Sequence, residues 1–362
     1  MKLIRYLLGL SLFLLAGQWV KADETAAESF NPQKSIFEHL GDEYGWNVWN
    51  LHIPLPVIVR DEEGAWHVFS SAKLAGGQEY EGFYIAGEGE YEGKVIARNA
   101  SGHIYRPWDF SVTKNVLALF ICALLLCWLV FPLVRWYKKK PYEAPRRVKG
   151  MMEFGVGMLY EELIVPILGK DARRFGPYLL TLFFFILLMN LMGLIVIFPG
   201  GANLAGNMSV TLVLAVCTFV VVNFSGRKGY WKDIFWPEVP TWLKCPVPMM
   251  PVIEIFGVFT KPIALMIRLF ANMLGGHLIT LVLISLIFIF AAMGPVIMGT
   301  STVIAVVFAV FMGFIDLLIC FIQAYVFMLL SAIFISLARP AETGTRPVSY
   351  THLRAHETSA HL

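Results

Sequence analysis

The residues best able to do chemistry lie in a long apolar run near the carboxyl end of the chain. Glu254, Lys261 and Arg268 are spaced seven residues apart, and seven steps of about 100° return to nearly the same face of a helix. Asn272 follows four residues later, within about 40° of Arg268. An arginine at the centre of a spanning helix costs about 2.5 to 3.5 kcal/mol on insertion scales. We therefore expect this polar stripe to serve a function.

Further polar groups lie in the same run and in the next one. In an antiparallel helical hairpin, His277 would lie about 13 Å beyond Arg268 along the first helix. Asp316 would lie about 10 Å beyond Gln323, in the same direction, along the second. His277 and Asp316 then share one level of the membrane. Arg268 and Gln323 share another.

The facing of His277 stays open at this point. Nine steps of about 100° put it on the side of the helix opposite Arg268. Curvature, or a disruption at Gly275 and Gly276, would reduce that angle; otherwise His277 faces away from Arg268. The alternative for His277 is a buried histidine whose side chain bonds to the backbone. The alternative for Glu254, Lys261 and Arg268 is that these charges snorkel or fix helix packing.

The two runs are unusually long for membrane spans. They cover residues 249–294 and 295–339, and as helices each would extend about 68 Å, more than twice the hydrocarbon thickness. Either each run holds two spans or each is one strongly tilted helix. The continuous polar stripe favours the tilted helix.

The composition indicates a polytopic membrane protein. Of the 362 residues, 57% are hydrophobic and 15% charged, and the apolar residues are gathered into blocks. The net charge is only +3 and the basic residues flank apolar blocks, which excludes a nucleic-acid partner. The five cysteines have no metal-ligand spacing, and no Walker or dinucleotide-binding glycine motif occurs. We expect no cofactor, no metal and no catalytic site in this chain.

The amino-terminal part differs in character. Residues 1–22 have basic residues, a short apolar core, and Val20 and Ala22 at the positions that a signal peptidase favours. They predict a cleaved secretory signal and a mature start near Asp23, and the alternative is an uncleaved first membrane anchor. Residues 23–110 consist of short Val-, Ile-, Trp- and Tyr-rich pieces broken by Gly and Pro. They predict a small, mainly β extracytoplasmic domain.

The remaining apolar blocks define the topology. Residues 115–134 form one span and end in RWYKKKPYEAPRRVK, which marks the cytoplasm. Residues 151–168 carry three glutamates and predict a helix at the cytoplasmic surface. Residues 178–198 span outward and 208–224 return to a basic cytoplasmic segment. The expected fold is all-α with about five membrane helices over 111–338, the last two a strongly tilted hairpin, plus the β extension.

Several segments together resemble a known family. LMIRLFANMLGGHL, preceded by TKP and followed by IQAYVFMLLSAIFISLA, is similar to subunit a of the F-type ATP synthase. The likeness also covers FFILLMNLMGLI and GNMSVTL, and so residues 150–338 approximately. HIPLPVIV resembles the exported extension of the Bacteroidetes-type subunit. The tail 339–362 contains YTHLRAHET, which resembles translated adaptor sequence, and the tail is assigned no function.

The resemblance implies a multi-pass inner-membrane subunit with an extracytoplasmic mature amino terminus and a cytoplasmic carboxyl terminus. Its partners would be the c-subunit ring, the b subunits of the peripheral stalk, the rest of the ATP synthase and the lipid bilayer. It would supply two half-channels for protons and an essential arginine between them. A His277 that faces away from Arg268 would then face the water channel and not the ring. The family residues map onto the following positions: Arg268, Asn272, Gln323 and Glu254, with His277 and Asp316 in exchanged positions relative to the commoner bacterial pattern.

Two other classes of function remain as alternatives. A secondary transporter would bind a solute near the midplane and usually shows paired repeats, but the R-L-F-x-N block has no second copy. An anchor for the exported domain would need one span and no polar residues inside it.

Overall fold

The structure is a computed structural model, and it describes most of the chain outside its two ends. The described ranges are 41–48, 51–87, 91, 93–98, 104–140, 142–195, 203–235, 249–291 and 295–339. The predicted signal 1–22, the start of the extension and the tail from 340 lie outside these ranges.

The amino-terminal part is built of short antiparallel strands, as the sequence predicted. The hairpin β1 (Gly45–Val48) and β2 (Leu51–Pro54) comes first. One three-stranded sheet has the order β4-β3-β8, made of Trp66–Ser70, Pro56–Arg60 and Trp108–Asp109. The other has the order β5-β6-β7, made of Phe83–Ile85, Val95–Arg98 and Ile104–Tyr105. A 3₁₀ turn, η1 (Ser71–Gly77), follows β4.

These two sheets share one small core. Along β3, Val57 and Val59 point inward and are fully buried, because alternate strand residues face opposite sides. They join Phe69, Phe83 and other apolar residues of both sheets in one cluster. The sheets are also joined by Tyr44, whose hydroxyl donates to Asp109 and accepts from the Val95 amide.

The strand region is fixed to the first long helix, α3 (Lys114–Lys139). Thr113 caps this helix, and the Lys114 amide donates to the Glu43 carbonyl at 2.9 Å. The Asn115 amide donates to the Asp42 carboxylate at 3.2 Å, a favourable position for an acid at a helix amino terminus. Trp46 of the β1–β2 hairpin is buried in the same core as Ala118 of α3. The hairpin is therefore packed on the helical part.

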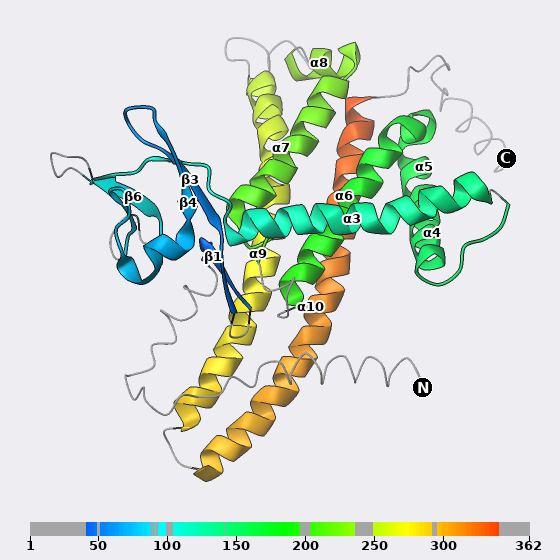
Figure 1. Cartoon of the computed structure of the whole chain (residues 1–362). Coiled ribbons are helices and arrows are strands. Elements are labelled where there is room, and N and C mark those ends of the chain that lie inside the picture. The colour runs from blue at the N-terminus through cyan, green and yellow to red at the C-terminus, as the bar shows by residue number, and fades with distance from the viewer. Residues whose placement is uncertain are drawn as a thin grey trace, which may run out of the picture.

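The rest of the described chain is helical (Figure 1). After α3 come α4 (Val148–Leu159), α5 (Val165–Leu168), α6 (Ala172–Leu194), α7 (Met208–Ser225) and α8 (Lys228–Phe235). The last two are α9 (Met249–Ala291) and α10 (Pro295–Ala338). Within the described residues, four helical segments are long and apolar enough to cross a membrane: Lys114–Lys139, Val148–Leu194, Met208–Ser225 and Thr300–Ala338. Helix α9 is not among these four, so the expected number of about five membrane helices stays a prediction.

The segment predicted as a surface helix is not one uniform helix. A π turn, η2 (Tyr160–Ile164), separates α4 from α5, and a 3₁₀ turn, η3 (Gly169–Asp171), separates α5 from α6. Gly169 has φ +52°, which a residue with a side chain rarely adopts, so the chain changes direction there. Figure 1 shows that the axes of α4 and α6 do not coincide. The placement of α4 at the cytoplasmic surface stays a prediction.

Helices α9 and α10 are each continuous over 43 and 44 residues. They lie side by side and run obliquely to α3 (Figure 1). The α10 side chains Ala324, Phe327 and Met328 are buried in one core with Leu179 and Phe183 of α6. Helix α6 therefore supports the pair of helices that carries the predicted site residues.

Candidate functional site

The centre of the site is a hydrogen bond between the two long helices. Asn272 of α9 donates its Nδ2 to the Oε1 of Gln323 on α10, at 2.6 Å. The Gln323 side chain is 4% exposed. Its Nε2 is buried and has no hydrogen-bond partner among the described residues. A buried amide donor costs free energy unless something accepts its hydrogen bond, so this position suits a water molecule or a partner group.

Arg268 lies one helical turn before Asn272 and points away from the core of the chain. Arg268 and Asn272 are exposed, whereas Leu265 and Leu269 are buried in the core shared with α6 and α10. Ile267, beside Arg268, is exposed as well. The guanidinium therefore lies on an outer face of α9, where no part of the described chain covers it.

Asp316 of α10 lies against the backbone of α9 next to His277. A Cβ added at Gly276 would stand 2.8 Å from the Asp316 Oδ1 and 3.2 Å from its Cγ. A larger residue at position 276 would therefore require the Asp316 carboxyl group to move. Together with the bond between Asn272 and Gln323, this contact shows that α9 and α10 run antiparallel. The register agrees with the level at which the sequence predicted Asp316 and His277.

The structure also bears on the facing of His277. Helix α9 continues through Gly275 and Gly276, so no local disruption turns the imidazole toward Arg268. The His277 Nε2 is buried, whereas Arg268 is exposed. His277 and Arg268 therefore differ in burial, and the prediction that His277 faces a channel stays a prediction.

Glu254 lies near the start of α9 and away from the central group. It is half-buried, and burial together with the Glu254 charge raises the pKa of Tyr230 in α8. Lys261 lies between these levels, with its ammonium 5.6 Å from the Phe334 ring centroid. It lines a small cavity, about 20 Å³, between α7, α9 and α10 that also contacts Tyr230. The structure thus spreads the predicted residues along α9 rather than gathering them at one point.

Asn190 is a polar residue that the sequence reasoning did not select. It is 2% exposed on α6, and its Nδ2 donates to the Cys320 carbonyl of α10 at 3.5 Å. That carbonyl lies one turn before Gln323. The available signal was a lone amide inside the apolar run FFILLMNLMGLI, where a polar side chain is costly.

A second cluster of polar residues lies at the carboxyl end of α10. Arg339 donates two hydrogen bonds to Asp171, from Nε at 2.9 Å and from Nη2 at 3.2 Å, and a third from Nη1 to the Ser225 carbonyl at 3.1 Å. The Arg227 amide donates to the Ala338 carbonyl at 2.9 Å. The ends of α7 and α10 and the start of α6 are joined there.

Comparison with known proteins assigns this helical arrangement to a family. The family model described as ATP synthase A chain matches residues 116–336, which include all six predicted site residues. The chain belongs to the ATP synthase A chain family. A second family model, described as a domain of unknown function, matches residues 35–110.

Curated relatives give the same result. The chain is 41% identical over 237 residues to ATP synthase subunit a 2 of Chlorobaculum tepidum, a match that covers 64% of each protein. It is 38% identical to ATP synthase subunit a of Myxococcus xanthus, over 64% of this chain and 73% of that protein. A third relative, ATP synthase subunit a of Chloroherpeton thalassium, is 38% identical over 64% of this chain and 67% of its own length.

Proposed function

We propose that this chain is the proton-conducting stator subunit of an F-type ATP synthase. It has no catalytic site of its own and couples proton flow to rotation of a c-subunit ring. The ring, the b subunits of the peripheral stalk and the rest of the ATP synthase are its partners in the inner membrane. About five helices cross that membrane, α9 and α10 as a tilted hairpin, with the β region outside and the carboxyl terminus in the cytoplasm.

The observation that carries this proposal is the exposure of Arg268 on α9. A guanidinium facing hydrocarbon is costly, so with α9 in the membrane, as we propose, the exposed arginine needs a polar partner from outside the chain. A ring carboxylate would be that partner. Guanidinium stays protonated at physiological pH, so Arg268 does not relay protons and instead blocks a direct leak between two half-channels.

The electrostatic effect of Arg268 has a suitable size. A ring carboxyl carried through lipid is kept neutral because desolvation raises its pKa. A unit charge at about 4 Å, with an effective dielectric of about 20, contributes about 4 kcal/mol, or about 3 pKa units. This favours release of the proton when the carboxyl reaches Arg268. Asn272 and Gln323, which hydrogen-bond to each other, would keep this surface polar and orient the guanidinium.

The remaining predicted residues belong to the two half-channels. His277 and Asp316 would relay protons on the outer side, because imidazole titrates near neutral pH and a nearby carboxylate favours its charged form. Glu254 would act on the cytoplasmic side, near Tyr230. The alternative function, a secondary transporter with a midplane site, has no observation in its favour.

The decisive experiment replaces Arg268 in the assembled complex. Arg268→Ala and Arg268→Lys are expected to assemble but to abolish ATP-driven proton pumping into proteoliposomes. Arg268→Lys is included because ammonium is compact and can lose its proton, which guanidinium does not. The alanine variant is also expected to raise passive proton permeability.

Arg173 provides the matched control. It is an exposed arginine in the first turn of α6. Arg173→Ala removes the same charge and is expected to keep pumping near the unmodified rate. Pumping that persists in the Arg268→Ala complex would overturn the proposed mechanism.

A further inference from the structure

One sheet of the β region has an outer face that is unusual for a domain in water. In the β4-β3-β8 sheet, the face opposite the core carries four large apolar side chains. Their exposed fractions are 57% for Trp66, 68% for Val68, 73% for Trp108 and 56% for Phe110. A free sheet face in water is normally polar, and exposed apolar patches mark interaction sites.

The face is one continuous surface. Arg60 pairs with Trp66 on one side and with Trp108 on the other, so these three side chains stand in one row across the sheet. The Trp66 and Phe110 rings are 5.5 Å apart, and the Arg60 guanidinium lies 5.7 Å from the Trp66 ring. We name these five residues the aromatic face: Arg60, Trp66, Val68, Trp108 and Phe110.

The aromatic face is rigidly joined to the first spanning helix. The Phe110 amide donates to the Ile58 carbonyl and the Val112 amide to the Pro56 carbonyl, so the sheet pairing continues almost to the helix cap at Thr113. Ser111 accepts a hydrogen bond from the Ile58 amide at 3.0 Å. No flexible linker therefore separates the sheet from α3.

This connection keeps the face near the bilayer. Phe110 is four residues before Lys114, the first residue of α3, which limits their separation to about 14 Å. The polar interface of a bilayer adds about 5 to 8 Å on each side of the hydrocarbon. Exposed apolar residues continue along α3 as Val116 and Phe120, which would contact lipid.

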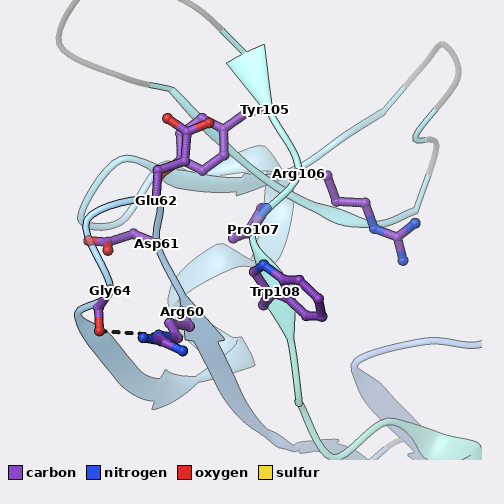
Figure 2. Close-up of a pocket in the computed structure, with 8 residues that line it drawn as sticks. All are labelled: Arg60, Asp61, Glu62, Gly64, Tyr105, Arg106, Pro107 and Trp108. Atoms are coloured by element: carbon purple, nitrogen blue, oxygen red, sulfur yellow. Dashed lines mark hydrogen bonds between the residues drawn. The ribbon is translucent and has the colours of Figure 1, made fainter.

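The side chains suit that interface. Tryptophan has an apolar ring and one polar N–H, and it is enriched at the level of lipid headgroups. Figure 2 shows the indole of Trp108 with Arg60 on one side and Arg106 extending on the other. Arginine at this depth can pair with lipid phosphate while its stem covers apolar surface.

We propose that the aromatic face lies in the headgroup region of the bilayer, with Trp66 and Trp108 inserted among phospholipids. The β region would thereby brace the outer end of α3 on the membrane. This inference requires only that α3 spans the membrane, and so it stands apart from the proton pathway proposed above.

The test introduces a photo-crosslinking amino acid, p-benzoylphenylalanine, at position 66 or 108 of the full complex in native membranes. We expect phospholipid adducts of this chain at both positions after illumination, detected by mass spectrometry. Tyr91 is the matched control, because it is an exposed aromatic residue in the turn between β5 and β6, outside the aromatic face. The same label at position 91 should give several-fold less lipid adduct.

Two outcomes would overturn the inference. Adducts to polypeptide at 66 and 108, whether to another subunit or to this chain, would mean that the face binds protein. Lipid adducts no more frequent than at position 91 would mean that it faces water. The Arg268→Ala complex should give the same lipid adducts as the unmodified complex, so a failed proton pathway does not affect this result.

Discussion

The α9–α10 pair and the β4-β3-β8 sheet both leave apolar side chains exposed. They differ in which exposed side chain has a polarity that does not suit its surroundings. On α9 it is a charge, Arg268, among exposed apolar neighbours. On the sheet it is an apolar ring, Trp66 or Trp108, in a region where a polar side chain such as His67 forms hydrogen bonds with its neighbours. A charge in lipid has a high free-energy cost, and so does a large apolar ring exposed to water. In each region the misplaced group marks the surface that we assign to a partner.

After the loss of pumping expected on replacing Arg268, the largest effect concerns the two relay residues on the α9–α10 side of this comparison. His277→Ala or Asp316→Ala should slow ATP-driven proton pumping by about a hundredfold, the low end of what a positioned acid or base contributes. The double exchange His277→Glu with Asp316→His should restore much of the rate. A double variant no faster than the single variants would show that the two residues do not act as a pair.

A smaller effect is expected at the contact that places Asp316. Gly276→Ala would put a methyl group 2.8 Å from the Asp316 Oδ1, so the carboxyl must move and pumping should fall several-fold. Gly275→Ala is the matched control, because nothing lies within 4 Å of its added Cβ. Alanine also favours a helix over glycine, so this variant should be at least as stable. Equal pumping rates in the two variants would mean that the position of Asp316 is not critical.

The next effect is on stability and tests whether the end of α10 is held firmly. Arg339→Ala removes a two-pronged contact to Asp171 and should destabilise the chain by about 1.5 to 3 kcal/mol, the range for hydrogen bonds to charged groups. Lys140→Ala removes the exposed Lys140–Glu143 pair and should change little. Thermal denaturation of the purified complex, followed by release of this chain, compares the two. Similar melting temperatures would contradict a role for Arg339 in holding α10.

The smallest effect lies in the β region and depends on pH. His67 donates hydrogen bonds to the carboxylates of Glu81 and Asp61, and this raises the pKa of His67 above 6.5. The same bonds lower the pKa of Asp61 below 3.8 and the pKa of Glu81 below 4.5. The imidazolium stabilises the fold fully below about pH 6.5, and this contribution is lost as the pH rises through the raised pKa. The carboxylates contribute above their unfolded pKa values and lose that contribution as the pH falls through the lowered ones.

The amides of β3 and β4 should therefore be most strongly protected from hydrogen exchange between about pH 5 and 6.5. Hydrogen exchange of β3 and β4 in the intact complex measures it, after correction for the intrinsic pH dependence of exchange. His67→Gln should remove the decline in protection between pH 6.5 and 8. A decline that persists in this variant would assign the effect to another group.

The sequence predicted the α9–α10 region better than the β region, for a physical reason. Arg268 and Asn272 could be selected because a polar group is costly in an apolar helix, whereas Gln323 was selected through the family resemblance. A helix then fixes the level of each residue by simple arithmetic. The structure then supplied the bond between Asn272 and Gln323, which spacing alone did not contain. Asn190 was missed because its partner is a backbone carbonyl of another helix.

In the β region the sequence indicated strands but not their partners. Trp108 pairs with Arg60, 48 residues earlier in the chain, and nothing local to either strand specifies that choice. The π turn at Tyr160–Ile164 was missed for a similar reason, because its close packing of Tyr160 on Gly176 is a tertiary contact. Strand pairing and helix interruptions depend on packing between distant segments, which a single sequence does not display.

The most direct measurement asks what contacts the exposed surface beside Arg268. Position 267 carries an exposed isoleucine next to Arg268, and position 120 carries an exposed phenylalanine on α3. With p-benzoylphenylalanine at position 267 of the complex in native membranes, illumination should link this chain to the small membrane subunit that forms the ring. The same label at position 120 should give phospholipid adducts. Phospholipid adducts alone at position 267 would contradict the claim that Arg268 faces the ring.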